Sequence, residues 1–249
     1  MRYLPFSRAA ATLAVLCAVL SACATPEVAK GINDPYEAQN RARHENNKRS
    51  DRVFLRPVSQ AYGKGVPEPV RTGVSNFAGN VDLPRSIVND VLQANIDDAA
   101  HNFARFLINT TFGIGGVFDP ATSMGLDPRV SDFGETLHVW GATEGHYVEM
   151  PIFGPSTKRD AFGRVVDLFL NPLSYIVPTP ERYAAPVSGF ASKIGDRYRF
   201  TETVDSILYD SADSYAQARL LYLQNRRFQL GQEPTEEEID PFAIDTEGF

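Results

Sequence analysis

The N-terminal segment constrains this chain most, because it determines where the protein folds and which cross-links it can form. Two arginines, Arg2 and Arg8, precede an apolar run from Ala9 to Leu20 that ends in small residues. This run is too short to span a bilayer comfortably, so it is typical of a secretory signal peptide rather than of a membrane helix. We therefore expect the chain to fold after export.

The residues that follow indicate a lipid anchor. The stretch Leu20-Ser21-Ala22-Cys23 resembles the lipobox of bacterial lipoproteins, in which the cysteine thiol carries the lipid. We interpret residues 1–22 as the signal peptide, Cys23 as the lipidation site and residues 23–33 as a tether. The alternative is an ordinary signal peptide that leaves Cys23 as a free thiol. Cleavage before Cys23 also removes Cys17, so lipidation leaves neither a disulfide nor a thiolate metal site.

The charge balance excludes one class of partner. Loss of the two signal-peptide arginines changes the formal net charge from -7 to -9. So acidic a chain is not expected to bind nucleic acid, or to adhere to an anionic leaflet by charge alone. Two or more acyl signals give durable anchoring whatever the surface charge. Membrane attachment is therefore assigned to the lipid on Cys23.

Hydrophobic periodicity and turn residues predict a mainly α fold with a single domain over residues 34–231. The short acidic end, residues 232–249, is predicted to be disordered because it holds many acids and little apolar surface. The predicted elements are a polar helix 34–51, short helices at 67–74, 83–93 and 96–107, a brief strand within 146–152, a helix from Arg159 to Leu170, a surface connection 172–186 and one long helix 201–230 that ends at Gly231.

An uncharged stretch, residues 106–118, has two interpretations. It carries three glycines near its end and is too short for a membrane-spanning helix, which needs about 20 residues. It is either a buried helix that stops at Gly113, or a segment that lies in the lipid interface or lines an apolar passage. Sequence alone leaves both open.

The residues that catalysis or metal binding requires do not form a recognisable pattern. The four histidines, His44, His101, His138 and His146, lack the spacing of four that places two zinc ligands on one helical face. No serine elbow or nucleotide-binding glycine motif is present. We therefore predict no catalytic residues, no metal site and no cofactor.

Many ordered motifs resemble the MlaA (VacJ) family of outer-membrane lipoproteins across about residues 33 to 230. The sixteen-residue stretch GHYVEMPIFGPSTKRD, residues 145–160, looks like the family's most recognisable signature. The other matching pieces are Asp34-Pro35-Tyr36-Glu37, Asn40-Arg41, Arg56-Pro57-Val58, Val66-Pro67, the stretch 71–77, Leu92-Gln93, the stretch 103–116 and the stretch 133–137.

This resemblance implies a fold, a location and a function. The expected protein is helical and ring-like, seated in the inner leaflet of the outer membrane and facing the periplasm. It would transport phospholipid without being an enzyme, removing mislocalised phospholipids from the outer leaflet and so maintaining lipid asymmetry. The implied partners are phospholipid, a trimeric porin and a soluble periplasmic lipid carrier linked to an ABC transporter. Ala24, directly after Cys23, also points to the outer membrane. The alternative function is a periplasmic lipid-degrading enzyme acting on the same phospholipids.

Two segments are the candidates for the lipid path: residues 106–118 and the signature stretch 145–160. Apolar side chains would contact acyl chains, and two adjacent cations would meet a phosphate. The candidate residues are Phe106, Phe112, Ile114, Tyr147, Met150, Phe153, Lys158 and Arg159. The alternative is a structural turn in which Arg159 pairs with Asp160 on the surface. The stretch 43–49 departs from the family, since it is too polar to sit among acyl chains.

Overall fold

The computed structural model describes residues 32–232. The predicted signal peptide, Cys23, and most of the tether and of the acidic tail lie outside the described residues. The elements, in chain order, are α2 (Glu37–Ser50), a π-helical segment (Asp51–Leu55), α3 (Arg56–Gly65), α4 (Glu68–Leu92), α5 (Ile96–Thr111), α6 (Pro120–Ser123), α7 (Phe133–Val139), β1 (Tyr147–Met150), β2 (Gly154–Thr157), α8 (Lys158–Leu170), α9 (Leu173–Ile176), a 3₁₀ turn (Glu181–Tyr183), α10 (Ala184–Arg199), α11 (Thr201–Asp205), a second π-helical segment (Ser206–Asp210) and α12 (Ser214–Gln229).

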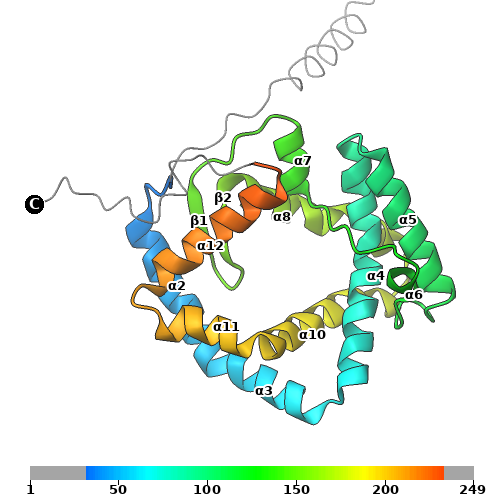
Figure 1. The fold of residues 1–249 in the computed structure, drawn as a ribbon, viewed down its shortest axis with the longest axis horizontal. Coiled ribbons are helices and arrows are strands. Elements are labelled where there is room, and N and C mark those ends of the chain that lie inside the picture. Colours follow the sequence, from blue (N-terminus) through cyan, green and yellow to red (C-terminus); the bar gives the residue numbers. More distant parts are fainter. Residues whose placement is uncertain (1–31, 233–249) are drawn as a thin grey trace, which may run out of the picture.

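The helices follow one another around a ring (Figure 1). On one side α4 packs against both α5 and α10, and α10 also packs against α3. Across the ring α7 packs on α8, β1 contacts α2 and β2 contacts α12. The two strands form an antiparallel hairpin in which Tyr147 is opposite Thr157 and Met150 is opposite Gly154. The predicted mainly α, ring-like single domain is confirmed.

The first predicted helix is present, but it is not capped as expected. α2 begins after Tyr36, and Asp34 lies outside it. The Asp34 carboxylate instead accepts a hydrogen bond from Asn40 Nδ2 at 2.8 Å and pairs with Arg219 of α12. The chain then stays helical through the π-helical segment and α3, until Val66 becomes extended before Pro67.

The prediction of separate short helices at 67–74 and 83–93 is wrong, because both belong to the single helix α4. Gly73, Gly79 and Pro84 all lie inside this helix. Pro84 removes one helical hydrogen bond, and next to this site Asn171 Nδ2 donates to the carbonyl of Val81 at 2.8 Å. Packing against α5 and α10 therefore keeps α4 continuous where local propensity favours a break.

The C-terminal third also differs from the prediction. Residues 201–230 are not one helix, because Ser211 is extended and Asp213 caps a new helix by accepting from Ala216 N at 3.0 Å. The connection 172–186 holds α9 and the start of α10, a helix that the proline-rich sequence concealed. On α12, Leu221 is 43% exposed, whereas Leu223 is buried.

The interior is polar and the surface is unusually apolar. None of the helices within residues 32–232 is both long and apolar enough to cross a bilayer. A small apolar cluster joins β1 to α12 through Tyr147, Tyr215 and Leu223. The buried apolar side chains of the described part are Leu83, Ala99, Ala121, Tyr147, Ile194, Tyr215 and Leu223.

Candidate functional site

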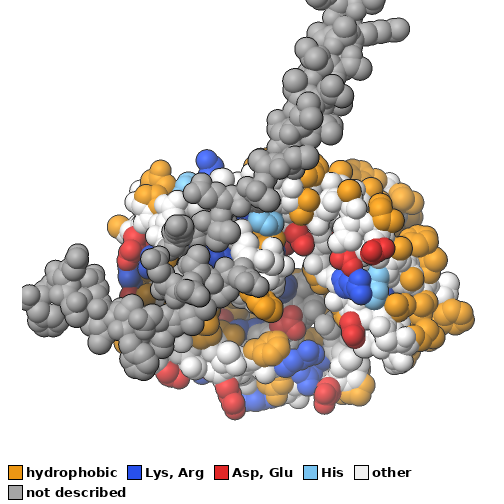
Figure 2. All heavy atoms as spheres, turned by 45° about the horizontal axis from the view of Figure 1, so that its top comes forward, with side chains coloured by type: hydrophobic (Ala, Val, Ile, Leu, Met, Phe, Trp, Pro, Cys, Tyr) orange, Lys and Arg blue, Asp and Glu red, His pale blue; other side chains and the backbone are white. Residues whose placement is uncertain are grey.

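α5 turns its polar side to the protein and its apolar side outward. Ala99, Asn102, Arg105 and Asn109 are its buried residues, and they recur at helical spacing. The opposite side continues into the turn after the helix and forms what we call the α5 apolar face, which consists of Ile96, Phe103, Leu107, Phe112, Ile114 and Phe118, all exposed. Apolar side chains gather over this region on the right of Figure 2. An exposed apolar area of this kind marks an interaction surface.

The turn after α5 settles the interpretation of the uncharged stretch. α5 ends at Thr111, and Phe112 and Ile114 are 75% and 70% exposed, so the buried-helix interpretation is wrong. Ile114 is left-handed with φ 53°, and Gly116 has φ 96°. A Cβ on Gly116 would lie 2.4 Å from Asn80 Cβ, so the turn needs glycine there to pack on α4.

Ion pairs and amides, rather than apolar contacts, fix the inner side of α5. Arg105 Nη2 lies 3.0 Å from Asp119 Oδ2, and Asn109 Nδ2 donates to Asp119 Oδ1 at 2.9 Å. Burial would raise the pKa of Asp119, but hydrogen bonds from Thr122, Asn109 and Arg105 outweigh it and lower that pKa. The turn 112–118 is thus held between α5 and α6 by polar contacts that meet at Asp119.

α8 repeats the same inverted polarity. Its exposed residues include Phe162, Val165 and Phe169, whereas Asp160 and Asp167 are buried. A Cβ on Gly163 would lie 2.4 Å from the backbone nitrogen of Gly134 in α7, so these two helices approach as closely as glycine permits.

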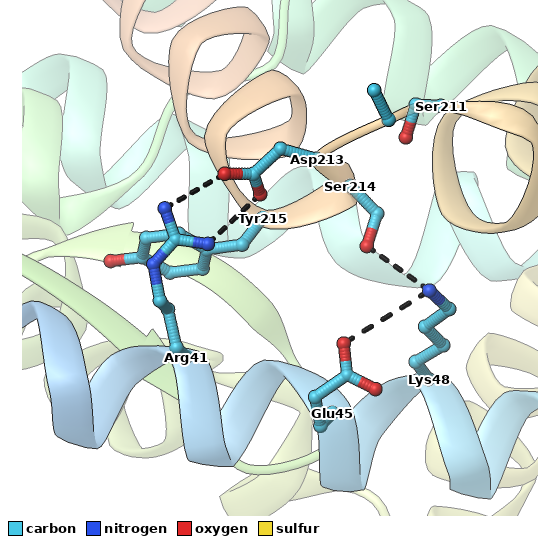
Figure 3. A pocket seen from close by; sticks show the side chains of 8 residues that line it. Arg41, Glu45, Lys48, Ser211, Asp213, Ser214 and Tyr215 are labelled. Carbon is cyan, nitrogen blue, oxygen red and sulfur yellow. Dashed lines mark hydrogen bonds and ion pairs between the residues drawn. The ribbon is translucent and has the colours of Figure 1, made fainter.

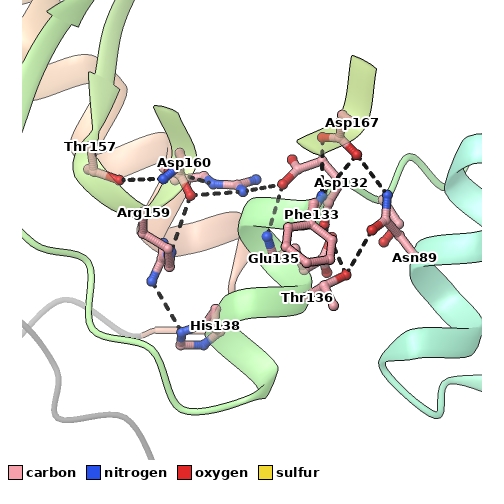
Figure 4. A network of polar contacts seen from close by, with 12 residues as sticks. Asn89, Asp132, Phe133, Glu135, Thr136, His138, Thr157, Arg159, Asp160 and Asp167 are labelled. Carbon is pink, nitrogen blue, oxygen red and sulfur yellow. Dashed lines mark hydrogen bonds and ion pairs between the residues drawn. The ribbon is translucent and has the colours of Figure 1, made fainter. Parts of the chain in front are cut away.

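A buried ionic network joins the start of α8 to α12 and α7 (Figure 4). Asp160 Oδ2 lies 3.1 Å from Arg226 Nε and accepts from Tyr222 OH at 2.7 Å, while Arg226 Nη2 lies 2.7 Å from Asp132 Oδ1. Burial would raise the pKa of Asp160, but the charges of Arg226 and Arg159 outweigh it and lower that pKa. The network therefore holds α8 in place while the Asp160 carboxylate is ionised.

Figure 4 also shows the polar contacts that link α7 to α4. The pKa of their central carboxylate, Asp167, shifts in the opposite direction to that of Asp160. Asp167 accepts from Asn89 Nδ2 at 3.0 Å and from Phe133 N at 3.2 Å. Thr136 Oγ1 donates to Asn89 Oδ1 at 3.0 Å. Burial dominates here and raises the pKa of Asp167 above its usual range, because few cations face it.

The structure separates the predicted lipid-path residues into three groups. Exposed side chains are Phe112, Ile114, Phe153 and Lys158, half-buried ones are Phe106 and Met150, and buried ones are Tyr147 and Arg159. Tyr147 OH donates to Glu149 Oε2 at 2.5 Å. Arg159 does pair with Asp160, at 3.2 Å, but within the protein rather than on the surface. Burial, together with the positive charge of Arg159, lowers the pKa of His138, which lies 3.4 Å from Arg159 Nη1.

Sequence reasoning missed a polar stripe on α2. Asn40, His44 and Asp51 are buried and Asn47 is half-buried, at the spacing of one helical face. His44 and Asn47 contact the hairpin, and Asp51 binds Arg197 at 2.8 Å. Within stretch 43–49, His44 and Asn47 thus face protein partners, whereas Arg43, Glu45, Asn46 and Arg49 are exposed. The spacing i, i+4, i+7, i+11 was the available signal.

A polar cleft of about 420 Å³ lies between α2 and the start of α12 (Figure 3). Arg41 holds the Asp213 carboxylate with two hydrogen bonds of 2.9 and 2.8 Å. This contact lowers the pKa of Asp213 to about 2. Lys48 Nζ lies 3.3 Å from Ser214 Oγ and 4.0 Å from Glu45. The cations of the cleft are thus already paired.

One serine, histidine and carboxylate do come together beside this cleft. Ser214 Oγ lies 3.1 Å from His44 Nε2, and His44 Nδ1 lies 3.4 Å from Glu149 Oε1. Glu149 also accepts from Tyr147 of β1 and from Asn47 of α2, so its carboxylate joins these two elements. His44 and Glu149 are 2% and 1% exposed. This cluster packs the hairpin between α2 and α12.

Comparisons with known proteins agree with this geometry. Residues 32–229 match the family described as MlaA lipoprotein. The Escherichia coli K12 protein named intermembrane phospholipid transport system lipoprotein MlaA is 33% identical over 80% of this chain and 79% of its own length. Its namesake from Haemophilus influenzae is 31% identical over 88% of this chain and 91% of its own length.

A solved structure extends the likeness to the fold. It comes from work on the structural basis for maintenance of bacterial outer membrane lipid asymmetry. It superimposes with a TM-score of 0.67 at 33% identity and covers 79% of this chain and 98% of its own.

Proposed function

The chain belongs to the MlaA lipoprotein family, and from that membership we propose that its ring of helices gives displaced phospholipid a path out of the outer leaflet. It is an outer-membrane lipoprotein of an intermembrane phospholipid transport system that maintains lipid asymmetry. It is a transport lipoprotein, not an enzyme, which removes the lipid-degrading alternative.

The observation that carries the proposal is the α5 apolar face. Its aromatic and aliphatic side chains are exposed, and the opposite side of the helix binds the protein through Arg105 and Asn109. Exposing these apolar side chains to water is unfavourable, whereas exposing them to acyl chains is not. We infer that α5 and the turn 112–118 lie in the inner leaflet, so that the ring faces the periplasm and Cys23 anchors the chain beside it.

The lipid headgroup needs polar partners along the same path, because a headgroup that crosses bare hydrocarbon loses its hydration. Lys158 is exposed and has no ion pair among residues 32–232, so it is available to a phosphate. Arg159, by contrast, is buried with Asp160 and would act by holding α8 in place. The proposed partners are a trimeric porin at the membrane and a soluble periplasmic lipid carrier that receives the phospholipid.

Complementation tests this proposal. In a strain lacking the gene, the wild-type chain should restore a phospholipid-poor outer leaflet and resistance to detergent. Phe112→Asp places a charge on the α5 apolar face and should fail to restore either, while Asn46→Asp, on the exposed polar side of α2, should succeed. An outer leaflet of normal composition in the deletion strain, or full complementation by Phe112→Asp, would contradict the proposal.

A further inference from the structure

On the outer edge of β1, Tyr147 N donates to the Asn33 carbonyl at 2.7 Å, and α2 covers the rest of this edge with side-chain amides. Asn40 Oδ1 accepts from Glu149 N at 3.1 Å, and Asn40 Nδ2 donates to the Tyr147 carbonyl at 3.2 Å. Seven residues later, on the same helical face, Asn47 Nδ2 donates to the Met150 carbonyl at 2.9 Å. The two asparagines replace the third strand that an unpaired β edge would otherwise need.

Asn47 also controls the turn of the hairpin. Its Oδ1 accepts from Ile152 N at 2.8 Å, and its Nδ2 donates to Glu149 Oε1 at 3.0 Å. Asn47 therefore holds both ends of the segment 149–152 with one side chain. An aspartate in its place could accept from Ile152 N, but it would lose both donated bonds and repel Glu149.

Ile152 is in a conformation that its side chain disfavours. Its φ is 68°, the left-handed region in which a β-branched residue is a strong outlier and glycine is at ease. Its side chain is 78% exposed, and that of Phe153 is 67% exposed. The chain thus holds a strained backbone in order to present two apolar side chains, an arrangement that points to function.

In the view of Figure 1, the turn between β1 and β2 extends toward the middle of the ring. We propose that Asn47 is a positioning residue that aims Ile152 and Phe153 at the acyl chains of phospholipid inside the ring. This inference rests on the proposed function, because it requires lipid to enter the ring. It assigns the acyl contact to the tip of the hairpin and the control of that contact to α2.

Photocrosslinking in native membranes tests the positioning role. A photoreactive residue at Phe153 should label phospholipid, and so should one at Phe112 on the α5 apolar face. Asn47→Asp should lower the Phe153 yield several-fold and leave the Phe112 yield unchanged. The matched control is Asn46→Asp, since Asn46 is exposed and its side chain makes no hydrogen bond within the described residues. Unchanged labelling from Phe153 in the Asn47→Asp chain would overturn the proposal.

A second variant separates positioning from folding. Ile152→Gly keeps the left-handed turn without strain, so its melting temperature should equal or exceed that of the wild type. Complementation by Ile152→Gly should nevertheless fall, because one of the two apolar side chains of the tip is lost. Full complementation would show that the Ile152 side chain has no role beyond the turn. If Phe112 labels lipid and Phe153 does not, the inference fails and the proposed function stands. If neither position labels lipid, the proposed function fails as well.

Discussion

Replacing Asp160 by Asn should destabilise the ring measurably, because the carboxylate lies between two buried arginines. The Asp160 and Arg226 side chains are 5% and 11% exposed, and Arg159 is 2% exposed. Removing one partner of a buried pair costs about 3–5 kcal/mol, since the remaining charge stays buried. Arg226 keeps Asp132 at 2.7 Å, so we expect the lower end, about 3 kcal/mol.

For a domain of this size, 1 kcal/mol corresponds to about 2–4 °C in melting temperature. Asp160→Asn should therefore unfold about 6–12 °C below the wild type at pH 7, as followed by circular dichroism in detergent. The control is Asp127→Asn, because Asp127 is exposed and its carboxylate makes no hydrogen bond or ion pair within residues 32–232. A surface change of this kind should alter stability by no more than about 0.5 kcal/mol.

The pH dependence of this difference has a definite sign. The folded-state pKa of Asp160 is lowered from its usual 3.8, so its stabilising contribution is present above that value. The contribution is lost as the pH falls through the lowered pKa, because the folded state must then take up a proton. The difference between variant and wild type should thus shrink in acid below about pH 4. A difference of less than about 2 °C at pH 7, or one that grows in acid, would refute the reasoning.

The remaining predictions concern packing and anchoring. Gly163→Ala places a methyl group 2.4 Å from the backbone nitrogen of Gly134, and overpacking of this kind costs about 1–3 kcal/mol. Its melting temperature should drop by several degrees, and an unchanged value would show that α7 and α8 separate freely. Cys23→Ala removes the predicted acylation site, so the chain should lose acyl label and accumulate as precursor or as soluble periplasmic material. Retention of label by that variant would contradict the assignment of Cys23.

Local signals predicted the segment around the signature stretch well. The helix predicted from Arg159 to Leu170 is present as α8, which Thr157 caps by accepting from Asp160 N at 3.2 Å and which ends before Asn171. The strand within 146–152 is also present as β1. Caps and turn residues act within a few positions, so one sequence is enough to recognise them.

Long-range contacts explain what the sequence did not reveal. The continuity of α4 depends on α5 and α10, which pack along it, and the break before α12 depends on Asp213, which Arg41 of α2 holds. Arg41 and Asp213 are 172 residues apart in the chain, and α10 is also distant from α4. The polar stripe of α2 was visible as a pattern, but its role requires the hairpin, more than a hundred residues away, against which Asn40 and Asn47 pack.

Periodicity identifies the apolar side of a helix, but it does not say whether that side faces protein or lipid. On α5 and α8 the usual assignment is inverted, with Phe103 and Phe162 exposed and Arg105 and Asp167 buried. Apolar contact drives helices together only when water is the alternative, and among acyl chains polar contacts have to hold them. Hydrogen bonds and ion pairs fix these helices to their neighbours, so the ring does not need a filled apolar centre. This construction suits the proposed function, in which polar groups beside the interior meet a phospholipid headgroup while the outer surface lies in the leaflet.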